Sequence, residues 1–263
     1  MTTKGTWTLA VGATLLWTGA TLATPTVQNK CDNARILAWK KYQSCVNGVV
    51  AKEAKGKGFD DYAAFAKCRH KYFGKWAKFQ SYTGSTCVGA RYTDNGDQTV
   101  TDNLSGLVWE KKDNLDGTTN PSDPHDADNT YTWSTGSPYK ESGTAFTGLL
   151  GTVNGGGGFG GANGWRLPTL AELQTIVLDF ECKGRGLGPT CSCPSSPCVD
   201  LALDAATTQP DHYWSATSST CLAGIEPCIP APGGAWRVGF TFADVFTNSK
   251  TLNFYVRAVR GGL

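Results

Sequence analysis

Ten cysteines constrain this chain more than any other feature of its sequence. Four of them lie between residues 31 and 87, and six lie between residues 182 and 228. An even number of cysteines suits complete pairing, and disulfides persist in oxidising compartments such as the periplasm and the extracellular space. The cysteines therefore predict a disulfide-bonded protein that folds outside the cytoplasm.

The N-terminus agrees with this compartment, because residues 1–23 have the features of a secretory signal peptide. Lys4 supplies a positive start, residues 7–20 are mainly apolar, and small residues lead to Ala23. The apolar run is shorter than the roughly 20 residues that a transmembrane helix needs, and no later segment is apolar enough to cross a bilayer. We expect a secreted protein, extracellular or at the cell surface, with the periplasm and an uncleaved N-terminal anchor as alternatives.

Charge divides the remainder of the chain into two parts. Residues 24–87 hold 12 Lys and Arg against 4 Asp and Glu, a net charge of +8, whereas residues 88–263 hold 11 against 18, a net charge of −7. We therefore predict a basic segment over 24–87 and a large acidic domain over 88–263. Such a split is typical of a surface-binding arm, or of two parts that dock on each other.

The basic segment has the pattern of two antiparallel helices. Apolar residues recur every three or four positions on both sides of a Gly-Lys-Gly break at residues 56–58. Facing pairs in such a hairpin have nearly constant sums of residue numbers, and Cys45 with Cys68 gives 113 while Cys31 with Cys87 gives 118. We predict these two disulfides, which would stabilise a unit too small to bury much core alone.

The hairpin also carries most of the positive charge, which has two interpretations. Exposed helix faces are normally charged, so the hairpin can be a solvated stalk or a dock for the next domain. Alternatively it grips an anionic polysaccharide or lipid; nucleic acid is not expected for a secreted protein. The residues available for this face are Lys40, Lys41, Lys52, Lys55, Lys57, Lys67, Arg69, Lys71, Lys75 and Lys78.

Local signals predict an α+β domain after residue 88. Asn95-Gly96 is a strong β-hairpin signal, and Thr169 with Glu172 has capping-box spacing, which predicts a helix over 170–180. A short helix is expected over 145–153 and a flexible Gly-rich loop over 155–161. Strands are expected over 212–218, 235–242, 244–246 and 252–259.

Five blocks of this domain carry a family resemblance: RYTDNGDQTVTDNLSGLVWEK, GWRLPTLAELQTIV, YWSATSS, AWRVGF and FYVRAVRGG. In this order they resemble the C-terminal domain family of the Legionella collagen-like adhesin, with a more distant similarity to formylglycine-generating and sulfatase-modifying domains. The resemblance implies a C-type-lectin-like fold with short antiparallel sheets, two helices, and terminal strands lying close together. It also implies attachment to sulfated glycosaminoglycans, although here the matching domain is acidic and no collagen-like repeat precedes it.

Aromatic and arginine side chains in these blocks and in the preceding loop are the candidate ligand-binding residues. They are Trp133, Arg166, Trp214, Trp236, Arg237 and Arg257. Such side chains stack on sugar rings or hold sulfate groups when they are exposed. Core packing and buried arginine pairing are the competing interpretation, because tryptophan mostly serves cores.

The remaining cysteines and the Asp-rich stretches are candidates for metal sites. Cys221 and Cys228 flank a short loop and are expected to pair, whereas pairing among Cys182, Cys191, Cys193 and Cys198 stays open; disulfides are favoured over zinc by the compartment. Calcium has potential oxygen ligands at residues 94–97 and at Asp123, His125, Asp126 and Asp128. A tight turn and a solvated loop are the simpler explanations of these residues, because Asp and Asn are common in turns, so we expect no cofactor, with calcium as the alternative.

Three functions follow from these features. The first is an extracellular binding protein that recognises a carbohydrate or a surface protein in adhesion, as a monomer or as an oligomer. The second is an interaction module of an envelope assembly, with the hairpin docking a partner. A degenerate formylglycine-generating-type enzyme is the third, but no cysteine follows Cys228, where those oxidases carry a reactive pair. We expect no enzyme activity.

Overall fold

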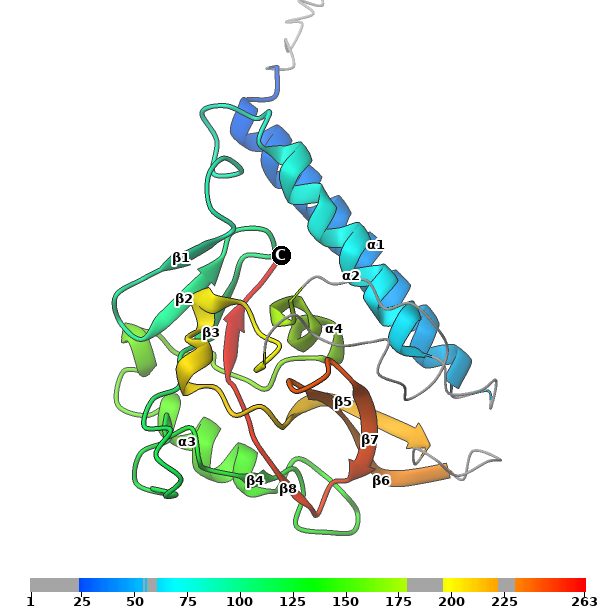
Figure 1. Ribbon diagram of the computed structural model, residues 1–263, viewed down its shortest axis with the longest axis vertical. Coiled ribbons are helices and arrows are strands. Elements are labelled where there is room, and N and C mark those ends of the chain that lie inside the picture. The colour runs from blue at the N-terminus through cyan, green and yellow to red at the C-terminus, as the bar shows by residue number, and fades with distance from the viewer. Residues whose placement is uncertain (1–23, 54, 56–60, 179–195, 222–229) are drawn as a thin grey trace, which may run out of the picture.

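The computed structural model describes residues 24–53, 55, 61–178, 196–221 and 230–263. Two long antiparallel helices, α1 (Val27–Glu53) and α2 (Asp61–Phe79), lie side by side along one edge of a mixed α+β body (Figure 1). The expected signal peptide lies outside the described residues. Within the part of the chain that the structure covers, no helix is long and apolar enough to span a membrane.

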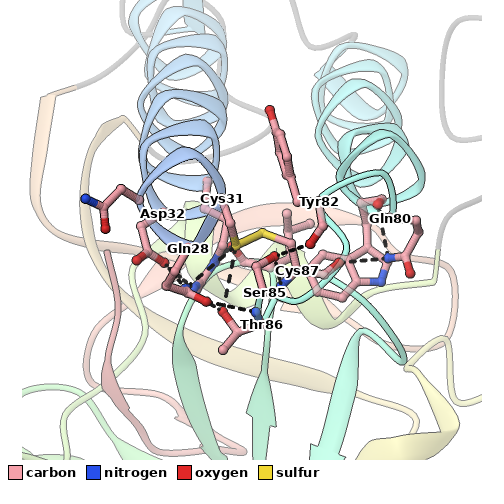
Figure 2. The surroundings of a disulfide bond; sticks show 12 residues. Gln28, Cys31, Asp32, Gln80, Tyr82, Ser85, Thr86 and Cys87 are labelled. Carbon is pink, nitrogen blue, oxygen red and sulfur yellow. Dashed lines mark hydrogen bonds and ion pairs between the residues drawn. A yellow bond between two sulfur atoms is a disulfide. The ribbon is translucent and has the colours of Figure 1, made fainter. Parts of the chain in front are cut away.

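Two disulfides join the helical hairpin at different levels. Cys45 of α1 bonds to Cys68 of α2, and Cys31 bonds to Cys87, as the sequence predicts. Figure 2 shows that Gln28 and Thr86 reinforce the second bridge, because the Gln28 Nε2 donates to Thr86 Oγ1 at 2.9 Å and the Thr86 amide donates to Gln28 Oε1 at 3.0 Å. This end of the hairpin is therefore fixed to the segment that leads into the body.

A four-stranded antiparallel sheet forms one part of the body, in the order β1-β2-β3-β9. Its strands are β1 (Tyr92–Asp94), β2 (Thr99–Asp102), β3 (Leu107–Glu110) and β9 (Val259–Gly261). The β1–β2 turn contains Gly96 with φ of 74°, which suits the predicted Asn-Gly hairpin. The last strand of the chain thus pairs with a strand from the start of the body.

The second part contains a three-stranded sheet, in the order β5-β6-β7, and a small β4–β8 pair. The strands are β5 (His212–Cys221), β6 (Pro230–Gly239), β7 (Val245–Ser249), β4 (Tyr131–Thr132) and β8 (Asn253–Phe254). The single strand expected over 252–259 is two strands, β8 and β9, which belong to different sheets. The segment from Leu252 to Val259 therefore crosses from one sheet to another.

Short helical segments connect the sheets. A π-helical segment, Ala145–Leu150, continues into α3 (Gly151–Val153), and α4 (Leu170–Leu173) continues into a 3-10 turn, Gln174–Ile176. Further 3-10 turns are Phe159–Gly161, Leu201–Leu203 and Ala205–Thr207. The capping box at the start of α4 is present as predicted.

The helix expected over 170–180 was wrong in its length. The carbonyl of Thr175 accepts hydrogen bonds from Arg91 Nη2 at 2.7 Å and from the Tyr92 hydroxyl at 3.1 Å. Val177 is extended and forms an antiparallel bridge with Val199. Tertiary partners therefore take the backbone groups that would otherwise continue the helix.

The hairpin and the body share one hydrophobic core. Phe65 of α2 packs edge-on against Trp236 of β6, with 6.3 Å between ring centroids. The buried hydroxyl of Tyr42 donates to the carbonyl of Ala171 at 2.9 Å. Phe65, Tyr42 and Trp236 are all almost fully buried. The hairpin is therefore docked on the body, which is one of the roles expected for it from the sequence.

Candidate functional site

Four of the six predicted ligand-binding side chains lie inside the protein. Trp133, Trp214, Trp236 and Arg257 are between 0 and 3% exposed. Arg257 donates to the carbonyl of Glu110 at 2.8 Å and to Thr208 Oγ1 at 2.7 Å. These four residues therefore pack and tie the core together, and a ligand cannot reach them in this conformation.

Arg166 is at the surface but is engaged by its own chain. Its guanidinium makes two hydrogen bonds of 2.7 Å to the carboxylate of Glu172, which also closes the capping box of α4. Its Nη2 also donates to the carbonyl of Gly261, the last residue of β9, at 3.2 Å. Arg166 thus connects α4 to the C-terminal strand, which is a structural task.

Arg237 is the predicted site residue that forms a surface cluster. Alternation along β6 buries Trp236 and Val238 and turns Arg237 to the opposite face of the sheet. There its guanidinium lies 4.6 Å from the ring centroid of Phe254 and 5.4 Å from that of Phe246. Both rings are partly exposed.

His212 completes this cluster, which we call the arginine–aromatic patch (His212, Arg237, Phe246 and Phe254). The imidazole lies 6.3 Å and 6.2 Å from the two phenylalanine rings. Its Nδ1 is 2.7 Å from the carboxylate of Asp211 and its Nε2 is 2.9 Å from that of Asp244. Sequence reasoning missed three members of the patch, because alternation predicted the face of each strand but not which strands would adjoin.

The hairpin contains a groove between its two helices, with a volume of about 430 Å³. Four lysines line it: Lys41 from α1, and Lys71, Lys75 and Lys78 from α2. We call this site the lysine groove. Lys40 and Lys67 are exposed but do not line it, and Lys57 lies outside the described residues.

Arg69 does not belong to the basic face. It is 2% exposed, and its Nη1 donates to Gln174 Oε1 of the body at 3.0 Å. The helical periodicity that turns Lys67 and Lys71 outward turns Arg69 inward. The assignment of Arg69 to the exposed basic face was wrong, because its charge alone does not reveal that it has a buried partner.

A buried ionic cluster lies beside the Asp-rich loop. Glu110 Oε1 is 2.7 Å from Lys112 Nζ and 2.8 Å from His125 Nδ1, while its Oε2 accepts the amide of Ala258 at 2.7 Å. Burial opposes ionisation of Glu110, but the charge of Lys112, with the contributions of His125 and Ala258, outweighs it and lowers the pKa to about 2. This carboxylate thus fixes the loop to the start of the C-terminal segment.

The Asp-rich loop itself is organised by its own backbone. Asp128 Oδ2 accepts the amides of Asp116 and Gly117 at 3.0 and 2.7 Å, and Asp123 Oδ1 accepts the amide of His125 at 2.9 Å. Asp94 forms an ion pair with Lys111 at 2.9 Å. In the described residues no group of three or more acidic, histidine or cysteine side chains has the arrangement of a metal site. These contacts show that the loop's carboxylates hold its backbone in place.

The remaining cysteines are described only in part. Cys198 is fully buried and disulfide-bonded. Cys182, Cys191, Cys193 and Cys228 lie outside the described residues, so the predicted Cys221–Cys228 pair is not described.

Residues 98–260 match the family model of the Lcl C-terminal domain. The chain belongs to this family. It is the family that the five sequence blocks resemble. No curated protein matches the chain, and no solved structure matches it.

The two surface sites fall on different sides of this match. All four residues of the arginine–aromatic patch lie within the Lcl C-terminal domain. The lysine groove is formed entirely by α1 and α2, which precede residue 98. The family match therefore includes the arginine–aromatic patch and does not include the lysine groove, whose role has to be inferred from its own residues.

Proposed function

We propose that this protein is an extracellular, adhesin-like binding protein whose Lcl C-terminal domain recognises carbohydrate at the arginine–aromatic patch. The observation that carries the proposal is Arg237 held between two partly exposed phenylalanine rings on the outer face of the β5–β6–β7 sheet and β8. Signal-directed secretion and the absence of enzyme activity are parts of the same proposal.

The proposed fold of this domain is C-type-lectin-like. Three features support it: short antiparallel sheets, a C-terminal strand paired with an early strand, and long connecting segments. Disulfides in the hairpin and at Cys198 suit a protein that works outside the cytoplasm.

The chemistry of the patch suits a sugar ring. Aromatic faces offer an apolar surface to the C–H groups of a sugar, and neighbouring polar groups bind its hydroxyls. Asp211, whose side chain is 57% exposed, can accept from a hydroxyl beside Arg237 and His212. Asp211 and Asp244 add negative charge at this place, so we propose that the patch prefers uncharged sugars to sulfated ones.

A glycan array that includes sulfated polysaccharides tests this function. The probe is the mature protein, residues 24–263, with its disulfides formed. We expect defined sugar binding that Phe246→Ala weakens about fivefold, since one aromatic contact contributes roughly 1 kcal/mol. The matched control is Phe242→Ala, which removes a phenylalanine that is 61% exposed and outside the patch.

Two results would contradict the proposal. One is the absence of glycan binding by folded, oxidised protein. The other is an equal loss of binding in the Phe246 and Phe242 variants, because the patch would then have no special part in recognition.

A further inference from the structure

The lysine groove combines two kinds of surface. Its floor is mainly apolar and is formed by Ala38 and Tyr42 of α1, Tyr72 and Gly74 of α2, and the Cys45–Cys68 disulfide. Its rim is formed by the four lysines and His70. A cationic rim over an apolar floor suits a ligand that carries a negative group on an apolar body.

The lysines of α2 form a row that extends beyond the groove. Lys67, Lys71 and Lys75 follow each other at intervals of four residues, and Lys78 continues the row. At a rise of 1.5 Å per residue the first three lie about 6 Å apart on one face of the helix. Among the described residues, none of these four lysines forms an ion pair with an Asp or Glu side chain. The nearby acidic residue of α1, Asp32, forms an ion pair with Arg35.

An exposed aliphatic side chain lies next to this charge on α1. Leu37 is 53% exposed. Leu37 precedes Lys41 by one helical turn, so the two side chains share a face. Large apolar side chains beside a row of lysines are typical of a surface that lies on a lipid bilayer, with the cations at the phosphates and the apolar groups between the headgroups.

We propose that the hairpin is a peripheral attachment surface for anionic lipid, with phosphate headgroups at the lysine groove and Leu37 inserted beside them. A sulfated polysaccharide would satisfy the lysines but has no apolar part for the groove floor or for Leu37. This attachment is independent of the carbohydrate function. In Figure 1 β8 lies on the side of the body away from α1. The hairpin packs on the Trp236 face of β6, whereas Arg237 lies on the opposite face, so attachment through the hairpin leaves the sheet face of the arginine–aromatic patch turned away from the lipid surface.

Co-sedimentation with lipid vesicles tests the proposal. The full mature chain is mixed with vesicles of phosphatidylcholine, with and without about one third phosphatidylglycerol. We expect binding only to the anionic vesicles, and a decrease of about 25-fold for Lys71→Gln/Lys75→Gln, since each lysine near such a surface contributes roughly fivefold. The control Lys30→Gln/Lys140→Gln removes the same charge from exposed positions outside the groove and should lower binding much less.

A second pair of variants tests the apolar contribution. Leu37→Asn should weaken binding to anionic vesicles at high salt, where charge is screened, whereas Leu201→Asn, at a 77% exposed position in the body, should not. The proposal is wrong if neither vesicle binds, or if the two lysine pairs lose binding equally. It is also wrong if dextran sulfate binds with the same lysine dependence while vesicles do not. None of these results alters the glycan-array outcome for Phe246.

Discussion

Acid should weaken this fold in a way that can be traced to one carboxylate, Glu110. The side chain is fully buried, and its pKa falls from 4.5 to about 2. Its folded pKa is therefore below its unfolded value, so it stabilises the protein above pH 4.5 and this stability is lost as the pH falls toward 2. The window of interest is pH 4.5 to 2.

The size of the effect follows from the shift. The lowering of the pKa of Glu110 from 4.5 to about 2 corresponds to about 3 kcal/mol of stability at neutral pH. At pH 3 about 1 kcal/mol of this stability remains, so about 2 kcal/mol should be lost between pH 7 and pH 3 through this residue. That is a large share of the stability of an ordinary domain.

Urea unfolding at pH 7 and pH 3, with the disulfides intact, measures this loss. Glu110→Gln should remove about 2 kcal/mol of the acid dependence that the wild type shows. The double variant Glu110→Gln/Lys112→Met avoids leaving a buried lysine without its partner and serves if the single variant does not fold. Glu141→Gln, at an exposed position, is the control and should keep the wild-type dependence. Parallel acid dependence in the wild type and both Glu110 variants would refute the reasoning.

Two further predictions concern the hairpin. Cys45→Ala/Cys68→Ala removes a disulfide between residues 23 apart in sequence, which gives the unfolded chain more conformational freedom. We expect the free energy of unfolding, measured by urea titration at pH 7, to fall by about 3.4 kcal/mol. An unchanged unfolding midpoint would contradict this. Tyr42→Phe removes the hydrogen bond from the hairpin to Ala171 and leaves a buried carbonyl without it, so it should cost about 1 to 3 kcal/mol in the same assay, whereas Lys40→Ala, at an exposed position, should change little.

Tertiary packing decided which candidate site residues can meet a ligand. Trp214, Trp236 and Arg237 lie in family-like blocks and look equivalent in sequence, yet the first two are buried and the third is partly exposed. Alternation along a strand determines which residues share a face, but not whether another element covers that face. On one face of the β5–β6–β7 sheet the hairpin covers Trp236 of β6. On the other face Phe254 of β8 covers Trp214 of β5.

The sequence by itself determined the features that depend on neighbours along the chain or on simple register. These are the two helices, the Cys45–Cys68 and Cys31–Cys87 pairs, the capping box of α4 and the family of the large domain. The tertiary structure alone decided the end of α4, the burial of Arg69, and the meeting of His212, Phe246 and Phe254 around Arg237. The physical reason is that periodicity records local geometry, whereas burial and surface clusters depend on contacts between segments far apart in the chain.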